Sequence, residues 1–247
     1  MCLGHEEWSA AQGGGAHGVY QAVLERARLR RGEFVVDIGT GRAELPAIAI
    51  EMGAARAVGL EYATAGASLA SQTLEARGVA DRATIVLADA RAIPIRDGSA
   101  DLVTMVDVVE HLAPTELHRT FIEALRILRP GGRIIVHTMP SRTVYQITYR
   151  LQRLIRPGRH RRWPADPRNE FERVMHVNEQ SVTALGRALR RAGFRPARAE
   201  LGRWVYTDFV PEERAKRLYH RLARVPLLAR LGVGDMWAEG VRPVDGT

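Results

Sequence analysis

Residues 34–46 read FVVDIGTGRAELP, and this stretch determines the expected fold of the chain. Its first five residues are mostly apolar or β-branched and predict a buried strand over residues 34–38. Gly39 and Gly41 permit a tight turn, and a helix is predicted over Leu45–Met52. A strand, a glycine-rich turn and a helix in this order place backbone N–H groups at the carboxyl edge of a parallel sheet. Nucleotide-like ligands bind at such an edge.

Two acidic residues narrow the choice of ligand. Glu44 stands where the dinucleotide fingerprint has its third glycine, and its charge would repel a pyrophosphate. Glu61 follows the next predicted strand at the distance suited to ribose hydroxyls, and one carboxylate can accept from both vicinal hydroxyls. A ligand with a ribose and no phosphates therefore fits better than NAD. S-adenosylmethionine (SAM), a cationic sulfonium, is such a ligand.

The sequence Asp37-Ile38-Gly39-Thr40-Gly41 resembles motif I of the class I SAM-dependent methyltransferases. Further segments resemble the family in order and with natural spacing between residues 34 and 139. They are the ribose-binding acid Glu61, the adenine-binding segment Ala88-Asp89-Ala90, the fourth strand and its exit at Asp101–Leu112, and the "L-x-P-G-G" turn at Leu128–Arg133. The chain departs from motif I at Ala43, where the family usually has a third glycine.

The resemblance implies that SAM is the cofactor and S-adenosylhomocysteine (SAH) the product. It also implies which residues contact the cofactor, from the glycine turn to the exit of the fourth strand. These residues are Asp37, Gly39, Thr40, Gly41, Glu61, Tyr62, Asp89, Ala90, Val106 and Asp107.

The expected fold is α/β, a Rossmann-like, doubly wound sheet of seven strands that is mostly parallel and has an antiparallel last strand. Strands are expected at 34–38, 54–60, 83–87, 101–106, 133–138, 195–205 and 235–241. Helices are expected at 19–31, 45–52, 68–77, 114–128, 179–192 and 212–231. Residues 1–15 read as a flexible N-terminus. Residues 16–247 read as one methyltransferase domain with a basic helical lid insert at 141–177.

The amino-acid composition gives indications of the cellular compartment of the protein and of the charge of its binding partners. The net charge is +8, and Lys216 is the only lysine, so nearly all the positive charge is arginine. This excess reflects either genomic base composition or attraction to anionic partners. Cys2 is the single cysteine, which excludes an intramolecular disulfide and favours a reducing compartment. No apolar run is long enough to span a bilayer, and the first residues lack the features of a signal peptide, so a cytoplasmic location is expected.

Two histidines are the candidate general bases. His111 lies at the exit of the fourth strand, where the resemblance places the transferable methyl group. His176 ends the insert, where histidines face the acceptor in some members of the family. Each candidate has an alternative, because His111 could instead hold the following loop by hydrogen bonds. The remaining histidines, such as His5 and His160, are isolated, so no metal site is expected.

The insert is the expected acceptor lid. Its arginines could hold a carboxylate or phosphate, and its aromatic side chains could form an apolar wall. The substrate-binding candidates are Tyr20, Tyr145, Tyr149, Arg150 and Trp163. Alternatively, the insert is a solvated basic flap that touches a membrane surface or another subunit. The expected oligomeric state is a monomer or a homodimer.

The leading hypothesis is a SAM-dependent methyltransferase that acts on the oxygen or nitrogen of a small molecule, which could be anionic, a lipid or a quinone. An RNA methyltransferase is the first alternative, favoured by the charge. It is disfavoured because Asp107-Val108-Val109 stands where base-modifying relatives carry an Asn/Asp-Pro-Pro-aromatic signature. A non-catalytic partner protein with the same fold is the second alternative. It is disfavoured because the motif acids and glycines are intact.

Overall fold

The computed structural model describes residues 15–139, 142, 146, 149–150, 154, 165–166, 168, 170–205, 221, 225 and 234–244. The N-terminal residues 1–14 lie outside this range, as do most residues of the predicted insert and of the predicted helix at 212–231. Tyr145 and Trp163, two of the substrate-binding candidates, also lie outside the described residues.

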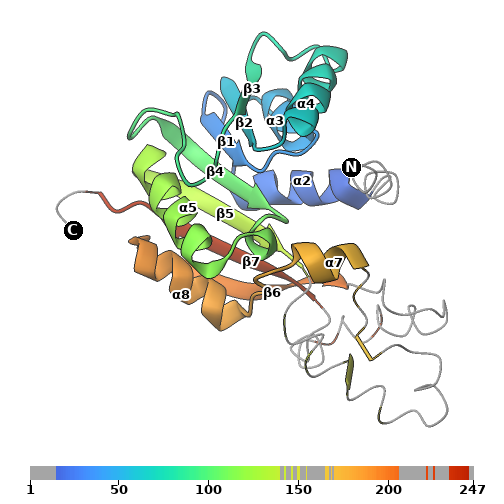
Figure 1. Ribbon diagram of the computed structural model, residues 1–247. Coiled ribbons are helices and arrows are strands. Elements are labelled where there is room, and N and C mark those ends of the chain that lie inside the picture. Colours follow the sequence, from blue (N-terminus) through green and yellow to red (C-terminus); the bar gives the residue numbers. More distant parts are fainter. Residues whose placement is uncertain are drawn as a thin grey trace.

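The fold is built on one seven-stranded sheet with the strand order β3-β2-β1-β4-β5-β7-β6 (Figure 1). The strands are β1 (Phe34–Ile38), β2 (Arg56–Glu61), β3 (Ala83–Leu87), β4 (Ala100–Val106), β5 (Leu128–Thr138), β6 (Ala197–Val205) and β7 (Gly234–Val241). The pairs within β3-β2-β1-β4-β5 are all parallel, and β7 pairs antiparallel with both β5 and β6. The predicted sheet, with its antiparallel last strand, is therefore confirmed.

Helices cover both faces of the sheet (Figure 1). They are α2 (Gly15–Arg26), α3 (Glu44–Glu51), α4 (Thr64–Ala76), α5 (Pro114–Ile127), α7 (Glu170–Met175) and α8 (Val182–Ala192), with a 3₁₀ turn η1 (Val109–His111). One core packs α2, α3 and α4 on the sheet through residues such as Leu24 and Ile48, and the other packs α5 and α8 through Phe121 and Leu189. Burial on both faces explains why the parallel strands are nearly uninterrupted apolar runs.

The predicted start of β5 was wrong. The strand begins at Leu128 and not at Arg133, because Leu128 already pairs with Ala100 before a register shift. Gly132 makes this continuous path possible, since a Cβ on it would lie 2.8 Å from the Arg129 carbonyl oxygen and 3.1 Å from that of Ala100. The Pro-Gly-Gly turn signal therefore marks a bulge inside the strand.

Helix ends also differ from the prediction. The predicted helix over 19–31 begins at Gly15 and ends at Arg26, because Arg28 (φ 52°) and Gly32 (φ 84°) take left-handed conformations that break it. Helix α8 begins at Val182 and not at residue 179, and the Ser181 hydroxyl accepts a hydrogen bond from the Ala184 N–H at 3.2 Å there. Among the described residues, no helix is both long and apolar enough to cross a membrane.

Candidate active site

The turn after β1 brings the main chain close to its neighbours and leaves one side open. The N–H groups of Gly39 and Thr40 both donate to the Leu60 carbonyl at 2.9 Å, which ties the turn to the end of β2. Gly39 has φ +72°, and a Cβ on it would lie 2.5 Å from Cγ2 of Val108. Gly41 has φ +54°, and a Cβ there would meet no atom within 4 Å. The glycine turn therefore presents bare main chain to open space at the carboxyl edge of the sheet.

Ala43 adopts the backbone conformation that the missing glycine of motif I would take. It is the N-cap of α3, with φ 60° and ψ 25°, and it is fully buried. A left-handed alanine costs about 1–2 kcal/mol. The departure from motif I is thus accommodated by local strain, without a change in the path of the chain.

Glu61 links the glycine turn to the beginning of α4. Its Oε2 accepts a hydrogen bond from the Gly41 N–H, and its Oε1 accepts from the N–H groups of Tyr62 and Ala63, all at 3.0 Å. A Cβ on Gly66 would lie 3.1 Å from the Glu61 carboxyl carbon, so this glycine makes room for the carboxylate. The sequence analysis did not identify Gly66 because an isolated glycine in a helix carries no specific signal.

Asp89 follows β3 at the same edge, but its carboxylate is already engaged. Arg91 donates to both oxygens, from Nε at 2.9 Å and from Nη2 at 2.6 Å, and this pairing lowers the pKa of Asp89. Arg91 also pairs with Glu116 on α5 at 2.5 Å. Tyr62, predicted to border the adenine, is 76% exposed. Ala90 is half-buried beside Asp89.

Asp37 lies inside the sheet, not at its surface. Asp37 is 4% exposed, and its carboxylate accepts a hydrogen bond from the Thr104 hydroxyl at 2.6 Å, across the β1–β4 pair. Burial raises the pKa of Asp37 to about 7. This side chain is therefore buried between β1 and β4, next to the glycine turn, and does not face open space.

The exit of β4 carries a chain of charged groups, of which the sequence analysis identified Asp107 and missed the buried His137 and Asp235. Asp107 has φ +53°, its N–H donates to the His137 carbonyl, and its Oδ1 lies 3.0 Å from Nδ1 of His137. On the other side of the ring, Nε2 of His137 lies 3.3 Å from Oδ2 of Asp235. Trp237 donates its indole N–H to Asp235 and packs edge-on against the imidazole. Burial opposes charging of His137, but Asp107 and Asp235 outweigh it and raise the pKa to about 10.

Tyr20 on α2 packs against the core that holds α2, α3 and α4 on the sheet. It is half-buried, and desolvation by this burial, followed by the charges of Asp37 and Asp107, raises the pKa of its phenol far above the ordinary value. The phenol is therefore neutral and close to both carboxylates. Val106, the last residue of β4, is half-buried and packs against the same core.

The two candidate bases, His111 and His176, lie together. Their rings are 5.0 Å apart in an edge-to-face arrangement, although they are far apart in sequence. Burial lowers the pKa of His111, and burial followed by the nearby His111 lowers the pKa of His176 to about 4. Beside them, Glu110 is buried and accepts from the Thr138 hydroxyl at 2.8 Å. Burial, then the charge of Asp107, raises the pKa of Glu110 to about 8.

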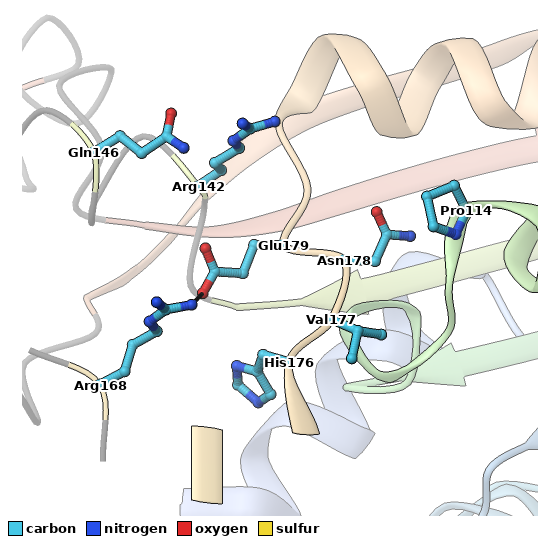
Figure 2. Close-up of a pocket in the computed structure, with 8 residues that line it drawn as sticks. All are labelled: Pro114, Arg142, Gln146, Arg168, His176, Val177, Asn178 and Glu179. Carbon is cyan, nitrogen blue, oxygen red and sulfur yellow. Dashed lines mark hydrogen bonds and ion pairs between the residues drawn. The ribbon is translucent and has the colours of Figure 1, made fainter. Parts of the chain in front are cut away.

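A cavity of about 380 Å³ opens beside His176 (Figure 2). It is lined by Pro114, Arg142, Gln146, Arg168, His176, Val177, Asn178 and Glu179. Figure 2 shows Arg168 joined to Glu179 by an ion pair, at 3.1 Å. Of the predicted substrate-binding residues in the insert, Tyr149 is fully buried and Arg150 is exposed.

The residues present fit SAM. The open side of Gly41 offers main-chain contact, and the Glu61 carboxylate, with three hydrogen bonds accepted out of about four possible, keeps acceptor capacity on Oε2. Asp89 supplies a second carboxylate one strand further along the same edge. Glu44, in the first turn of α3, pairs with Arg77 at 2.9 Å and keeps an acid where a pyrophosphate would bind. Two carboxylates and an open stretch of main chain suit an adenosine that carries no phosphates.

The comparisons with known proteins agree with this geometry. A family model described as "Methyltransferase domain" matches residues 36–136. The demethylmenaquinone methyltransferase of Thermus thermophilus is 32% identical over 131 residues, which cover 52% of this chain and 56% of the relative. The 27-O-demethylrifamycin SV methyltransferase of Amycolatopsis mediterranei is 29% identical over 180 residues, covering 70% and 57%. The chain thus spans little more than half the length of these curated relatives.

Solved structures share the fold across most of the chain. The [4+2]-cyclase SpnF superposes with a TM-score of 0.64 at 20% identity, covering 93% of this chain and 81% of the other. The geranyl diphosphate C-methyltransferase of Streptomyces coelicolor A3(2) gives a TM-score of 0.63 at 15% identity, covering 91% and 78%. The segment that matches the methyltransferase domain model begins in β1 and ends in β5, so the similarity in sequence covers the parallel part of the sheet and the glycine turn.

Proposed function

We propose that this protein binds SAM at the carboxyl ends of β1, β2 and β3 and transfers its methyl group to a small-molecule acceptor. The observation that carries the proposal is the Glu61 carboxylate, which accepts from Gly41 N–H at the open glycine turn. A carboxylate in that position suits a ribose diol.

Different residues of the chain would contact different parts of the cofactor. The main chain of Gly39–Gly41 would contact the methionine portion, Glu61 the ribose hydroxyls, and Asp89 with the Ala90 N–H the adenine edge. Asp107, at the exit of β4, would meet the polar end of the methionine portion. When bound, the sulfonium supplies an already activated methyl group.

Alignment of donor and acceptor is then the main task of the protein. Holding two reactants in line in a pocket without water lowers the activation free energy by about 7–11 kcal/mol. A base is needed only if the acceptor must lose a proton early, as a hydroxyl does. Nδ1 of His111 lies 3.1 Å from the Met175 carbonyl, so Nε2 is the atom that could accept this proton. His176, with its lowered pKa, is the second neutral imidazole available.

For the acceptor we propose a small molecule with a large apolar part and a hydroxyl or amine group. The relatives named above carry the names of demethylmenaquinone, 27-O-demethylrifamycin SV and geranyl diphosphate, all small molecules. The cavity beside His176 includes Arg142 in its lining, which supports an acceptor that also carries negative charge.

Calorimetric titration with SAH tests the cofactor half of the proposal. Glu61→Ala should weaken SAH binding at least tenfold, because a lost hydrogen bond to a charged group costs about 1.5–3 kcal/mol. Glu75→Ala, an exposed acid on α4, is the matched control and should bind SAH like the wild type. Equal affinity of the Glu61 variant would remove this residue from the site.

Transfer is measured separately, because a protein named as a cyclase shares the fold. The full chain is incubated with SAM that carries a tritiated methyl group and with a panel of quinols, phenols and amines. Label in the organic extract supports a small-molecule acceptor. Label in added RNA would favour the RNA alternative, and SAH binding without any label transfer would favour a partner protein.

A further inference from the structure

Three side chains that commonly ligate metals meet beside the exit of β4. Glu110 and His111 lie on η1, and His176 follows α7. One potential ligand atom from each lies within 4.8 Å of the other two. We propose that Glu110, His111 and His176 form a binding site for a divalent transition metal ion, for which zinc is the best match.

Main-chain contacts hold the two halves of this cluster together. The Asn178 N–H donates to the Glu110 carbonyl at 3.0 Å, and the Met175 carbonyl lies 3.1 Å from Nδ1 of His111. These two contacts fix the chain on both sides of His176 against η1. The juxtaposition is therefore set by one contact between main-chain groups and one between the His111 ring and the main chain.

The side chains present the right atoms for a metal. A carbonyl oxygen can only accept, so the contact with Met175 requires a proton on Nδ1 of His111 and leaves the lone pair on Nε2. Metal-bound histidines usually donate their other N–H to a carbonyl or carboxylate in this way. The Thr138 hydroxyl orients the Glu110 carboxylate. Nδ1 of His176 is buried and has no hydrogen-bond partner among the described residues.

The distances suit a site that closes around its ion. Tetrahedral zinc with nitrogen and oxygen ligands at about 2.0–2.1 Å holds its ligand atoms about 3.3 Å apart. The present separations, up to 4.8 Å, require small rotations of the two imidazoles toward the carboxylate. Two imidazoles and one carboxylate favour zinc over magnesium, which prefers oxygen ligands. Three protein ligands also leave a fourth position open, as in catalytic zinc sites.

The consequence for chemistry rests on the proposed function. A hydroxyl bound at the open position would have a lowered pKa, so the metal would prepare an acceptor oxygen for methylation. The lone pairs of His111 and His176 would then be occupied, and neither would act as a free base. Metal binding itself does not depend on methyl transfer.

The test uses the untagged full chain, freed of metal by a chelator and titrated with Zn²⁺ alone. We expect one tightly bound ion per chain. His176→Gln and Glu110→Gln should each weaken zinc binding at least about 100-fold, since loss of an outer-shell partner alone costs 10–100-fold. His118→Gln, an exposed histidine on α5, is the matched control and should leave the affinity unchanged.

Two outcomes would overturn the proposal. One is the absence of stoichiometric zinc binding, and the other is a His176→Gln variant that binds zinc as tightly as the wild type. Cobalt substitution in the wild type decides the matter if a variant fails to fold, because a tetrahedral site with histidine ligands gives intense visible absorption. SAH titration of the metal-free chain separates the two proposals, since SAH binding without zinc binding refutes the metal site only.

Discussion

The buried imidazole of His137 predicts a specific dependence of stability on pH. Its ordinary pKa is 6.5, and the carboxylates of Asp107 and Asp235 raise the pKa in the folded protein to about 10. The folded state therefore binds this proton more tightly than the unfolded state. The resulting stabilisation is complete below pH 6.5 and disappears as the pH rises through 10.

The magnitude follows from the two pKa values. At about 1.4 kcal/mol for each pKa unit, the full contribution at low pH is about 5 kcal/mol. Linkage leaves about 4 kcal/mol of it at pH 7 and about 1.4 kcal/mol at pH 9. The free energy of unfolding should thus fall by about 2.5 kcal/mol between these two pH values through His137 alone.

Urea unfolding at pH 7 and pH 9 measures this change in the wild type and in a variant that lacks the imidazole. The single change His137→Gln removes the cation that faces the buried Asp235, and breaking such a pair costs about 3–5 kcal/mol, so His137→Gln with Asp235→Asn is the practical variant. The pKa of Glu110 is also raised, to about 8, so this carboxyl group likewise lowers the free energy of unfolding as the pH rises through this range. The difference between the two proteins measures the contribution of His137 together with its charge coupling to Glu110 and Asp235.

An equal loss of stability in wild type and variant would refute this reasoning. It would mean that His137 is neutral in the fold, and that the chain from Asp107 through His137 to Asp235 is held by neutral hydrogen bonds. A wild type whose free energy of unfolding rises between pH 7 and pH 9 would show the opposite of the predicted change and would likewise refute a charged His137.

Three predictions concern the glycine turn. Gly41→Ala should lower the free energy of unfolding by only about 1–2 kcal/mol, because its Cβ would meet no atom within 4 Å. The same variant should bind SAH more weakly. Thermal unfolding and calorimetry on one preparation separate the two effects. Gly39→Ala should be more destabilising in urea, since its Cβ would lie 2.5 Å from Val108, and Val108→Ala should restore part of the loss. Ala43→Gly should change stability by less than about 1 kcal/mol, because relief of the left-handed strain is offset by chain entropy and by the lost methyl burial. A large loss in the last variant would show that Ala43 is not strained.

Much of the fold could be predicted because its signals are local. The run FVVDI with the two glycines specifies a strand and a turn within a few residues, and the apolar strands reflect burial on both faces. The positions of Glu61 and Asp89 at strand ends followed from the same pattern. The start of β5 was missed because Gly132 serves a close backbone approach inside the strand, whereas Pro-Gly-Gly alone indicates a turn.

The remainder of the site depends on contacts between distant residues. His137 lies in an apolar strand, and only its neighbours Asp107 and Asp235 make it a charged group. His111 and His176 were each identified as single candidates, but their proximity depends on how the segment after α7 docks on η1. No periodicity in the sequence carries that information. The contact between Asp89 and Arg91 was equally unforeseen, because an ion pair two residues apart depends on the local turn.

A crystal structure of the full chain with bound SAH tests the central claim most directly. The geometry described here predicts the ribose hydroxyls within hydrogen-bond distance of the Glu61 carboxylate, the adenine beside Asp89, and the main chain of Gly39–Gly41 against the amino-acid portion. Electron density for SAH elsewhere on the protein would contradict it, as would a complex in which Glu61 and Asp89 both point into solvent.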